Sequence, residues 1–234
     1  LTYAYPAELL TPLLPPGLTL DTYEGLGFLA IAMVQTRALR PAGLPRFLGR
    51  NFFLSGYRIF ARHQNAQGKQ MRGLRILRSD TDSRWMAAFG NLLTHYNYRH
   101  CGLTETRGAN TLSLSIETKG AEADLALHAR LDPSPTEPPH GSPFPDLAAA
   151  RKFAGPLPFT FDYEHGSHSL VIIQGVRTHW TPRPVEVEVT RNTFLSAPPF
   201  DRAPVRLANA FYLEDVPYRW EPGVLSKLPG KATA

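Results

Sequence analysis

Apolar and polar residues alternate along much of this 234-residue chain, which is the pattern of β-strands that bury one face. The clearest case is the segment VEVEV at residues 185–189, where three valines alternate with two glutamates. Longer segments rich in apolar and β-branched residues predict the other strands. We predict strands over residues 26–37, 51–63, 70–77, 96–103, 111–119, 123–131, 158–164, 169–177, 184–191 and 218–220. Residues 203–213 fit either a strand or a helix.

Only short segments have the pattern of helices. Residues 5–14 carry Pro6 near their start and are followed by two prolines and a glycine, which predicts a short helix. Asp80, Thr81 and Ser83 are N-cap candidates for a helix over residues 82–93, and residues 146–154 predict a third. Many strands with few short helices indicate a mainly β (α+β) protein with an antiparallel sheet. We expect its edges to be removed by closure into a single barrel.

The chain contains one segment that cannot form regular structure. Residues 132–145 are dense in proline, and we predict a Pro-rich surface loop there. Strands of similar character lie on both sides of it, so we expect residues 1–234 to form a single domain. A domain of this length buries about 70–75% of its unfolded surface, which is enough for a core without disulfides.

The charge of the chain is strongly basic but dispersed. The formal net charge is +5, and twenty of the 25 basic residues are arginines, scattered singly rather than in blocks. Neither a helix-turn-helix nor a zinc-finger or RNA-recognition signature accompanies them, which disfavours nucleic acid as a partner. The planar guanidinium pairs with carboxylates through two hydrogen bonds. The arginines therefore suit a small, anionic ligand, and they suit structural ion pairs equally.

A few residues bear on the cellular compartment of the protein and on whether it binds a cofactor. Cys101 is the only cysteine, which excludes an internal disulfide framework and indicates a reducing, cytoplasmic location. The apolar run at residues 28–34 is far shorter than the roughly 20 residues of a membrane helix, and no basic-then-apolar leader opens the sequence. His165 and His168 are only two candidate ligands, and zinc requires three or four. We expect no metal, no cofactor and no membrane partner, and a homo-oligomer stays open.

Candidate site residues lie around the helix predicted at residues 82–93. Asp80 and Arg84 are four apart, so either Arg84 holds a ligand carboxylate while Asp80 fixes the turn, or the two form a capping pair that orients the helix. His95 is a candidate acid, base or donor near neutral pH, and it equally fits a packed histidine. The ligand-binding candidates are Arg84, Asp80, Arg58 and Tyr98. The chain has no nucleophile-elbow, P-loop or dinucleotide motif.

Three motifs carry a family resemblance. LLPPGL at residues 13–18, LRPAGLP at 39–45 and RSDTDSR at 78–84, with the later helix–strand His-Tyr motif, resemble the YqjF-like family of unknown function. That family is similar to the acetoacetate-decarboxylase-like superfamily, and the resemblance covers residues 5 to about 228. It implies one cone-like antiparallel β-barrel that encloses a small apolar cavity with a few polar groups.

The resemblance also shows a departure. Acetoacetate decarboxylases use a lysine that forms an imine, with its pKa lowered by an apolar pocket and a neighbouring cation. The matching stretch here, NLLTH at residues 91–95, has no lysine, which implies that this protein is not an imine-forming decarboxylase. We expect a barrel that binds a small anionic or carbonyl-containing molecule. The alternative is a lysine-independent lyase or hydrolase of a small carboxylic acid, with His95 as acid/base and Arg84 as electrostatic clamp.

Overall fold

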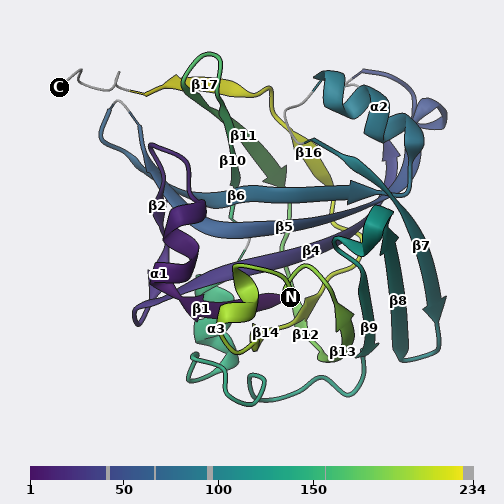
Figure 1. Ribbon diagram of the computed structural model, residues 1–234. Helices are drawn as coiled ribbons and strands as arrows, with labels where there is room; N and C mark the ends of the chain where they lie inside the picture. The colour runs from purple at the N-terminus through teal and green to yellow at the C-terminus, as the bar shows by residue number, and fades with distance from the viewer. Residues whose placement is uncertain (41–42, 66, 94–96, 156, 229–234) are drawn as a thin grey trace.

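The computed structural model describes residues 1–40, 43–65, 67–93, 97–155 and 157–228 (Figure 1). Fifteen of its strands join one sheet, and nine of them form a continuous path. In order along this path the strands are β13 (Glu186–Asn192), β9 (Leu125–Arg130), β8 (Thr111–Thr118), β7 (Arg99–Arg107), β6 (Gln70–Thr81), β5 (Arg50–Gln64), β4 (Leu26–Leu39), β1 (Thr2–Pro6) and β14 (Arg206–Asn209). The protein is therefore mainly β, as the alternation predicted.

The sheet branches at β6. The first half of this strand pairs in parallel with β10, whereas its last residues pair in parallel with β7. Gly73 permits the branch, because a Cβ at this position would lie 2.5 Å from the carbonyl oxygen of Phe159 in β10. The branch consists of β10 (Phe159–Glu164), β11 (Ser169–Arg177), β16 (Tyr218–Trp220) and β17 (Val224–Lys227). Four shorter strands complete the fold: β2 (Thr19–Leu20), β3 (Thr22–Tyr23), β12 (Arg183–Pro184) and β15 (Phe211–Tyr212).

The helices are short and lie at the ends of strands. In Figure 1, α2 lies where β6 ends, whereas α1 and α3 lie toward the opposite side of the molecule. The bounds are α1 (Ala7–Leu10), α2 (Arg84–Leu93) and α3 (Leu147–Phe153), with 3-10 turns η1 (Thr11–Leu13), η2 (Arg46–Leu48), η3 (Lys119–Ala121) and η4 (Phe200–Arg202). The Asp146 carboxylate accepts a hydrogen bond from the Ala149 amide at 2.7 Å and caps α3, which confirms the helix predicted there.

Two helix starts lie later than predicted, both because strand pairing extends further than the pattern suggested, although residues 7–13 are helical and Ser83 was among the cap candidates. The helix predicted over residues 5–14 is preceded by β1, which pairs with β4 and β14, and α1 spans only four residues. The strand β6 runs on to Thr81, so Asp80 is a strand residue and does not cap α2. The cap is Ser83, whose Oγ accepts a hydrogen bond from the Met86 amide at 3.2 Å.

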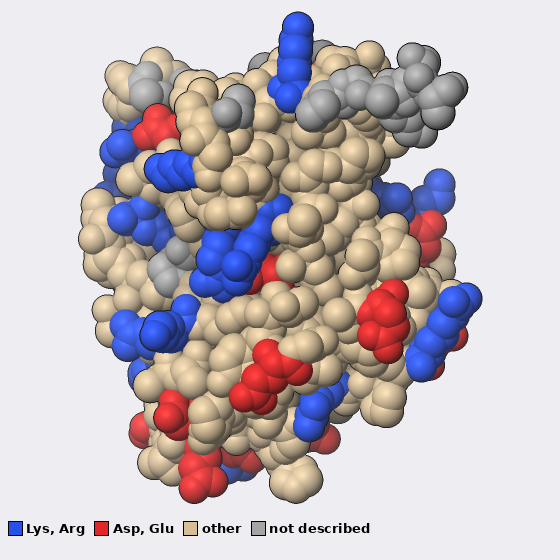
Figure 2. All heavy atoms as spheres, turned by 90° about the vertical axis from the view of Figure 1, so that its left-hand side faces the viewer, with Lys and Arg blue, Asp and Glu red and all other residues tan. Residues whose placement is uncertain are grey.

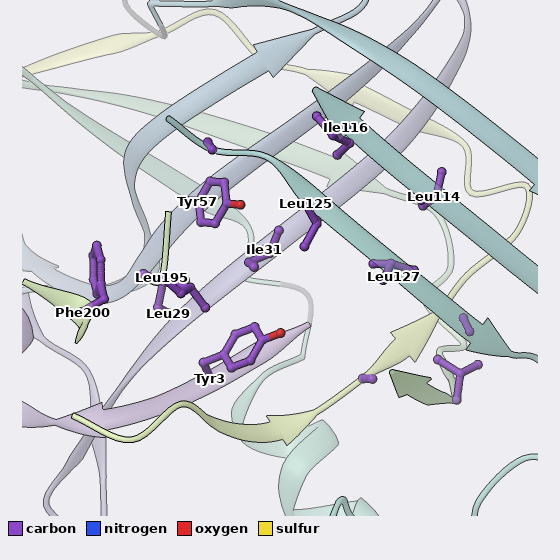
Figure 3. Close-up of a cluster of buried hydrophobic side chains, with 14 of the residues drawn as sticks. Tyr3, Leu29, Ile31, Tyr57, Leu114, Ile116, Leu125, Leu127, Leu195 and Phe200 are labelled. Atoms are coloured by element: carbon purple, nitrogen blue, oxygen red, sulfur yellow. The ribbon is translucent and has the colours of Figure 1, made fainter. Parts of the chain in front are cut away.

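A large apolar cluster fills the interior between the strands of the main path (Figure 3). Side chains from β1, β4, β5, β8 and β9 point toward one another there, together with side chains from the segment before and within η4. Val187 and Val189 pack against this cluster, whereas Glu186 and Glu188 are exposed, which confirms the predicted two-faced strand. The labelled members in Figure 3 are Tyr3, Leu29, Ile31, Tyr57, Leu114, Ile116, Leu125, Leu127, Leu195 and Phe200.

Cys101 belongs to this cluster, and its burial has a measurable consequence. Its side chain is 2% exposed, and burial raises the pKa of the thiol to about 12. Because the thiolate is the reactive form, we expect a disulfide reagent at pH 8 to leave the folded protein unmodified and to titrate one thiol in denaturant. Modification of the folded protein at the rate of a free peptide thiol would contradict this environment.

The Pro-rich segment is anchored by aromatic packing. The Phe144 ring stacks on Phe28 of β4 with ring centroids 5.4 Å apart, and Phe153 of α3 lies 4.8 Å from the same Phe28 ring. Phe60 of β5 extends this group. The loop is therefore fastened to the sheet at its end, just before α3 begins, by apolar burial and ring contacts.

The surface charge is mixed. On the face in Figure 2, basic side chains lie singly and in small groups among acidic and uncharged ones. Several surface arginines pair with carboxylates on the same or the next strand, including Arg130 with Glu186 at 2.9 Å and Arg219 with Glu221 at 2.8 Å. Structural ion pairs thus account for part of the arginine content. None of the helices in the described ranges has the length and apolar character needed to cross a membrane.

Candidate functional site

A small hollow lies between the centre of β5 and β6 and the strand β16. Its cavity volume is about 30 Å³, which holds one or two water-sized groups and is far below the roughly 300–1,000 Å³ of sites for drug-sized molecules. Only one small chemical group, such as a carboxylate, fits inside. The lining residues are Leu54, Ser55, Arg58, Ile76, Ser79, Tyr98, Thr160, Tyr218 and Trp220.

Arg58 points toward this hollow from a position beside a β-bulge. Tyr57 pairs with Arg78, but Arg58 pairs with Ile76, so Leu77 is an extra residue on β6. Tyr57 points into the main apolar cluster, and its neighbour Arg58 consequently points to the other face of the strand. The Arg58 Nε lies 3.2 Å from where a Cβ of Gly56 would be, so the guanidinium folds back over that glycine.

Arg58 is distinguished by a buried Nε without a hydrogen-bond partner among the described residues. Its Nε is buried and makes no hydrogen bond, and within the described ranges no carboxylate pairs with its guanidinium. A buried donor without an acceptor costs roughly 1–3 kcal/mol, and more when the group is charged. Four other arginines on β5 and β6 each pair with an aspartate: Arg62, Arg72, Arg75 and Arg78.

Tyr98 is the predicted site residue that lies beside Arg58 in the lining of the hollow. It is buried, and Asn91 of α2 hydrogen-bonds to its backbone on both sides, accepting from the amide and donating to the carbonyl oxygen at 2.9 Å. These two bonds join α2 to the residue that precedes β7. The structure therefore brings Arg58 and Tyr98 together.

Arg84 and Asp80 do not reach the hollow. Arg84 is the first residue of α2, and its side chain is exposed. Asp80 is 1% exposed and accepts hydrogen bonds from Arg78, at 2.8 Å from Nε and 2.9 Å from Nη2. Two expectations are therefore corrected. Asp80 pairs with Arg78 and not with Arg84, and Arg84 is exposed and does not face an enclosed cavity. The reason is that β6 continues to Thr81, so Asp80 follows strand alternation and pairs two residues back.

Arg78, Asp80 and Glu122 form a buried ion cluster that opens to solvent at Glu122. Burial raises the pKa of the Asp80 carboxyl, and the hydrogen bonds from Arg78 oppose that rise. Burial also tends to lower the pKa of Arg78, but hydrogen bonds to Asp80 and to Glu122, at 2.7 Å, raise it overall. The charged groups of the cluster pair with one another, so we assign the cluster a structural role. His95 and Tyr96 lie outside the described residues, and the role of His95 stays a prediction.

A second depression, of about 290 Å³, is formed by residues 136–146 of the Pro-rich segment itself. Two of its polar groups already have partners, because the Ser142 hydroxyl donates to the Ala208 carbonyl oxygen at 2.7 Å and Asp146 caps α3. It is wide open and lacks a converging charge, so we do not assign it as the site.

Lysines and metal ligands do not gather at the hollow in the part of the chain that the structure describes. The four described lysines are exposed: Lys69, Lys119, Lys152 and Lys227. None of them is among the lining residues. The described residues also contain no group of three or more His, Cys, Asp or Glu side chains placed to hold a metal ion.

Solved structures of the acetoacetate-decarboxylase type share this fold. An acetoacetate decarboxylase-like enzyme from Sphingomonas wittichii RW1 superposes with a TM-score of 0.59 at 17% identity, over 97% of this chain and 89% of the other. Acetoacetate decarboxylase from Legionella pneumophila gives 0.50 at 14% identity, over 97% and 81%. The enduracididine biosynthesis enzyme MppR with bound HEPES buffer gives 0.51 at 12% identity, over 96% and 84%. Identities this low establish a common fold only.

The sequence comparisons are consistent with the motifs found above. No curated protein matches the chain. A family model does match, and it covers residues 1–217, which is nearly the whole sequence. The chain therefore belongs to the DUF2071 family, described as an uncharacterized conserved protein, and it has the acetoacetate-decarboxylase-like fold.

Proposed function

We propose that the protein binds a small anionic or carbonyl-containing molecule at the hollow, with Arg58 and Tyr98 as binding residues. The observation that carries this proposal is the buried Nε of Arg58, which has no acceptor in the part of the chain that the structure describes. A carboxylate or carbonyl oxygen in the hollow would supply that acceptor and, if anionic, the missing countercharge. Hydrogen bonds that involve a charged group are about twice as strong as neutral ones.

Solved structures with the same fold support a small oxygen-bearing ligand. The solved structures that share it include one named acetoacetate decarboxylase and one named an acetoacetate decarboxylase-like enzyme, and the MppR structure holds a buffer molecule. Imine formation is not part of this proposal, because the four described lysines are exposed and none lines the hollow.

We also infer that the sheet closes into a barrel around the main apolar cluster. The two ends of the strand path are β13 and β14. Their neighbours β12 and β15 pair with each other, and the Val185 amide donates to the Ala210 carbonyl oxygen at 3.1 Å. These contacts support closure, because full closure removes the exposed edges of a sheet.

Arg58→Gln tests the binding proposal. We expect small carboxylates that bind the wild-type protein in isothermal titration calorimetry to bind this variant about 10- to 100-fold more weakly, because a charged hydrogen bond contributes roughly 1.5–3 kcal/mol. Arg50→Gln, an exposed arginine at the start of the same strand, is the matched control and should bind like wild type. The proposal fails if no small carboxylate or carbonyl compound binds the wild-type protein, or if Arg58→Gln binds it equally well.

A further inference from the structure

Arg177 packs against Tyr218, one of the residues that line the same hollow. It is the last residue of β11 and pairs directly with Tyr218 of β16, just as Gly175 pairs with Trp220. Residues two apart on a strand share a face, and directly paired residues point to the same side of a sheet. Tyr218 and Trp220 line the hollow, so Arg177 is on the face that borders it.

Aromatic rings hold Arg177 in place. Its guanidinium carbon is 5.2 Å from the centroid of the Trp180 ring and 5.0 Å from that of Tyr218, and its Nη1 donates to the Leu157 carbonyl oxygen at 3.4 Å. These contacts orient a cation without neutralising it. The Tyr218 ring leans over Gly175, where a Cβ would lie 2.5 Å from the tyrosine Oη.

Arg58 and Arg177 together make an uncompensated pair of cations. Within the described ranges neither forms an ion pair with a carboxylate. Burial lowers the pKa of Arg177, and the nearby charge of Arg58 lowers it further. Both arginines also act on Tyr218: burial raises the pKa of its hydroxyl, and the two cations oppose that rise. Two cations without a carboxylate partner among the described residues, both acting on one tyrosine, suit a ligand with more than one negative charge.

We propose that the ligand is a small dicarboxylate, with one carboxylate on Arg58 inside the hollow and the second on Arg177 at its mouth. This inference rests on the proposed function and adds the substrate class. The hollow of about 30 Å³ admits one carboxylate and leaves the rest of the molecule outside. There it lies against Tyr218, which is 39% exposed, and the stacked guanidinium of Arg177 presents a planar fork that matches a second carboxylate.

The test compares acids of equal carbon number on four proteins. Malonate, succinate and glutarate are titrated against propionate, butyrate and valerate in calorimetry, using wild type, Arg58→Gln, Arg177→Gln and Arg219→Gln. Arg219 is the control, because it alternates to the other face of β16, pairs with Glu221 at 2.8 Å and gives the same change in net charge. We expect wild type to bind the best dicarboxylate at least about tenfold more tightly than its matched monocarboxylate.

The variants separate this inference from the proposed function. Arg177→Gln should remove the preference and leave monocarboxylate affinity within about twofold of wild type, whereas Arg58→Gln should weaken both classes. Wild type that binds monocarboxylates without favouring dicarboxylates would overturn the inference and leave the proposed function standing. If neither class of acid binds, both fall.

A conservative variant distinguishes charge from packing. Arg177→Lys keeps the charge but loses the planar stacking between the rings, so we expect it to retain part of the preference for the dicarboxylate. If Arg177→Lys loses the preference as completely as Arg177→Gln, and both variants also bind monocarboxylates less tightly, the residue only supports the packing of β16, and the inference is overturned.

Discussion

Arg78→Met is expected to lower the free energy of unfolding by about 3–5 kcal/mol, as measured by urea denaturation. The reason is the partner that this change leaves behind. Asp80 is 1% exposed and accepts three hydrogen bonds from Arg78. Without the guanidinium, Asp80 must either keep a buried, unpaired charge or take up a proton in the folded state, and each costs stability.

Two further variants show whether charge is the cause. Arg99→Met removes the second arginine that pairs with Glu122. Both side chains of this pair are about half exposed, so this change should cost much less stability than Arg78→Met. The double variant Arg78→Met/Asp80→Leu removes both buried charges and should recover most of the lost stability, because an ion pair replaced by apolar residues is often neutral or stabilising. A double variant as unstable as Arg78→Met would refute the electrostatic explanation.

Asp21→Asn is expected to lower the free energy of unfolding by about 3 kcal/mol, again in urea. Asp21 is fully buried and receives hydrogen bonds from Arg62 and Arg72, each at 2.6 Å. Its backbone amide also donates to the Phe60 carbonyl oxygen at 3.0 Å. The side chain therefore ties the link between β2 and β3 to both β5 and β6. The amide of asparagine would place a donor against one guanidinium and remove the charge that both arginines need.

Asp215→Asn is the matched control for this change. Asp215 pairs with Arg37 at 3.7 Å, and its side chain is 90% exposed. Solvent screens such a pair, so we expect its loss to change stability by no more than about 0.5 kcal/mol. Equal effects of the two asparagine variants would show that the buried carboxylate has no special role in joining the strands.

The sequence singled out two residues of the site proposed here. Arg58 and Tyr98 were predicted, and both line the hollow. Arg177 and Tyr218 were missed, although Gly175 two residues before Arg177 was a signal of close backbone approach in a strand. The signal could not be interpreted without knowing that Tyr218, some forty residues later, pairs with Arg177. Arg84 was chosen from helical spacing that does not apply, because Asp80 belongs to a strand.

Local patterns determined the strands and the sites of chain reversal. The alternation in β13, the Ser83 and Asp146 caps and the Pro-rich loop depend on neighbours within a few residues, and such preferences can be read along the chain. The tertiary structure decided which arginines have acidic partners. Arg58 and Arg62 lie on one strand, yet of these two only Arg62 meets a carboxylate from the described ranges, because Asp21 reaches it from a distant part of the chain. That outcome depends on strand register and on the branch at β6, which long-range packing sets and local sequence does not record.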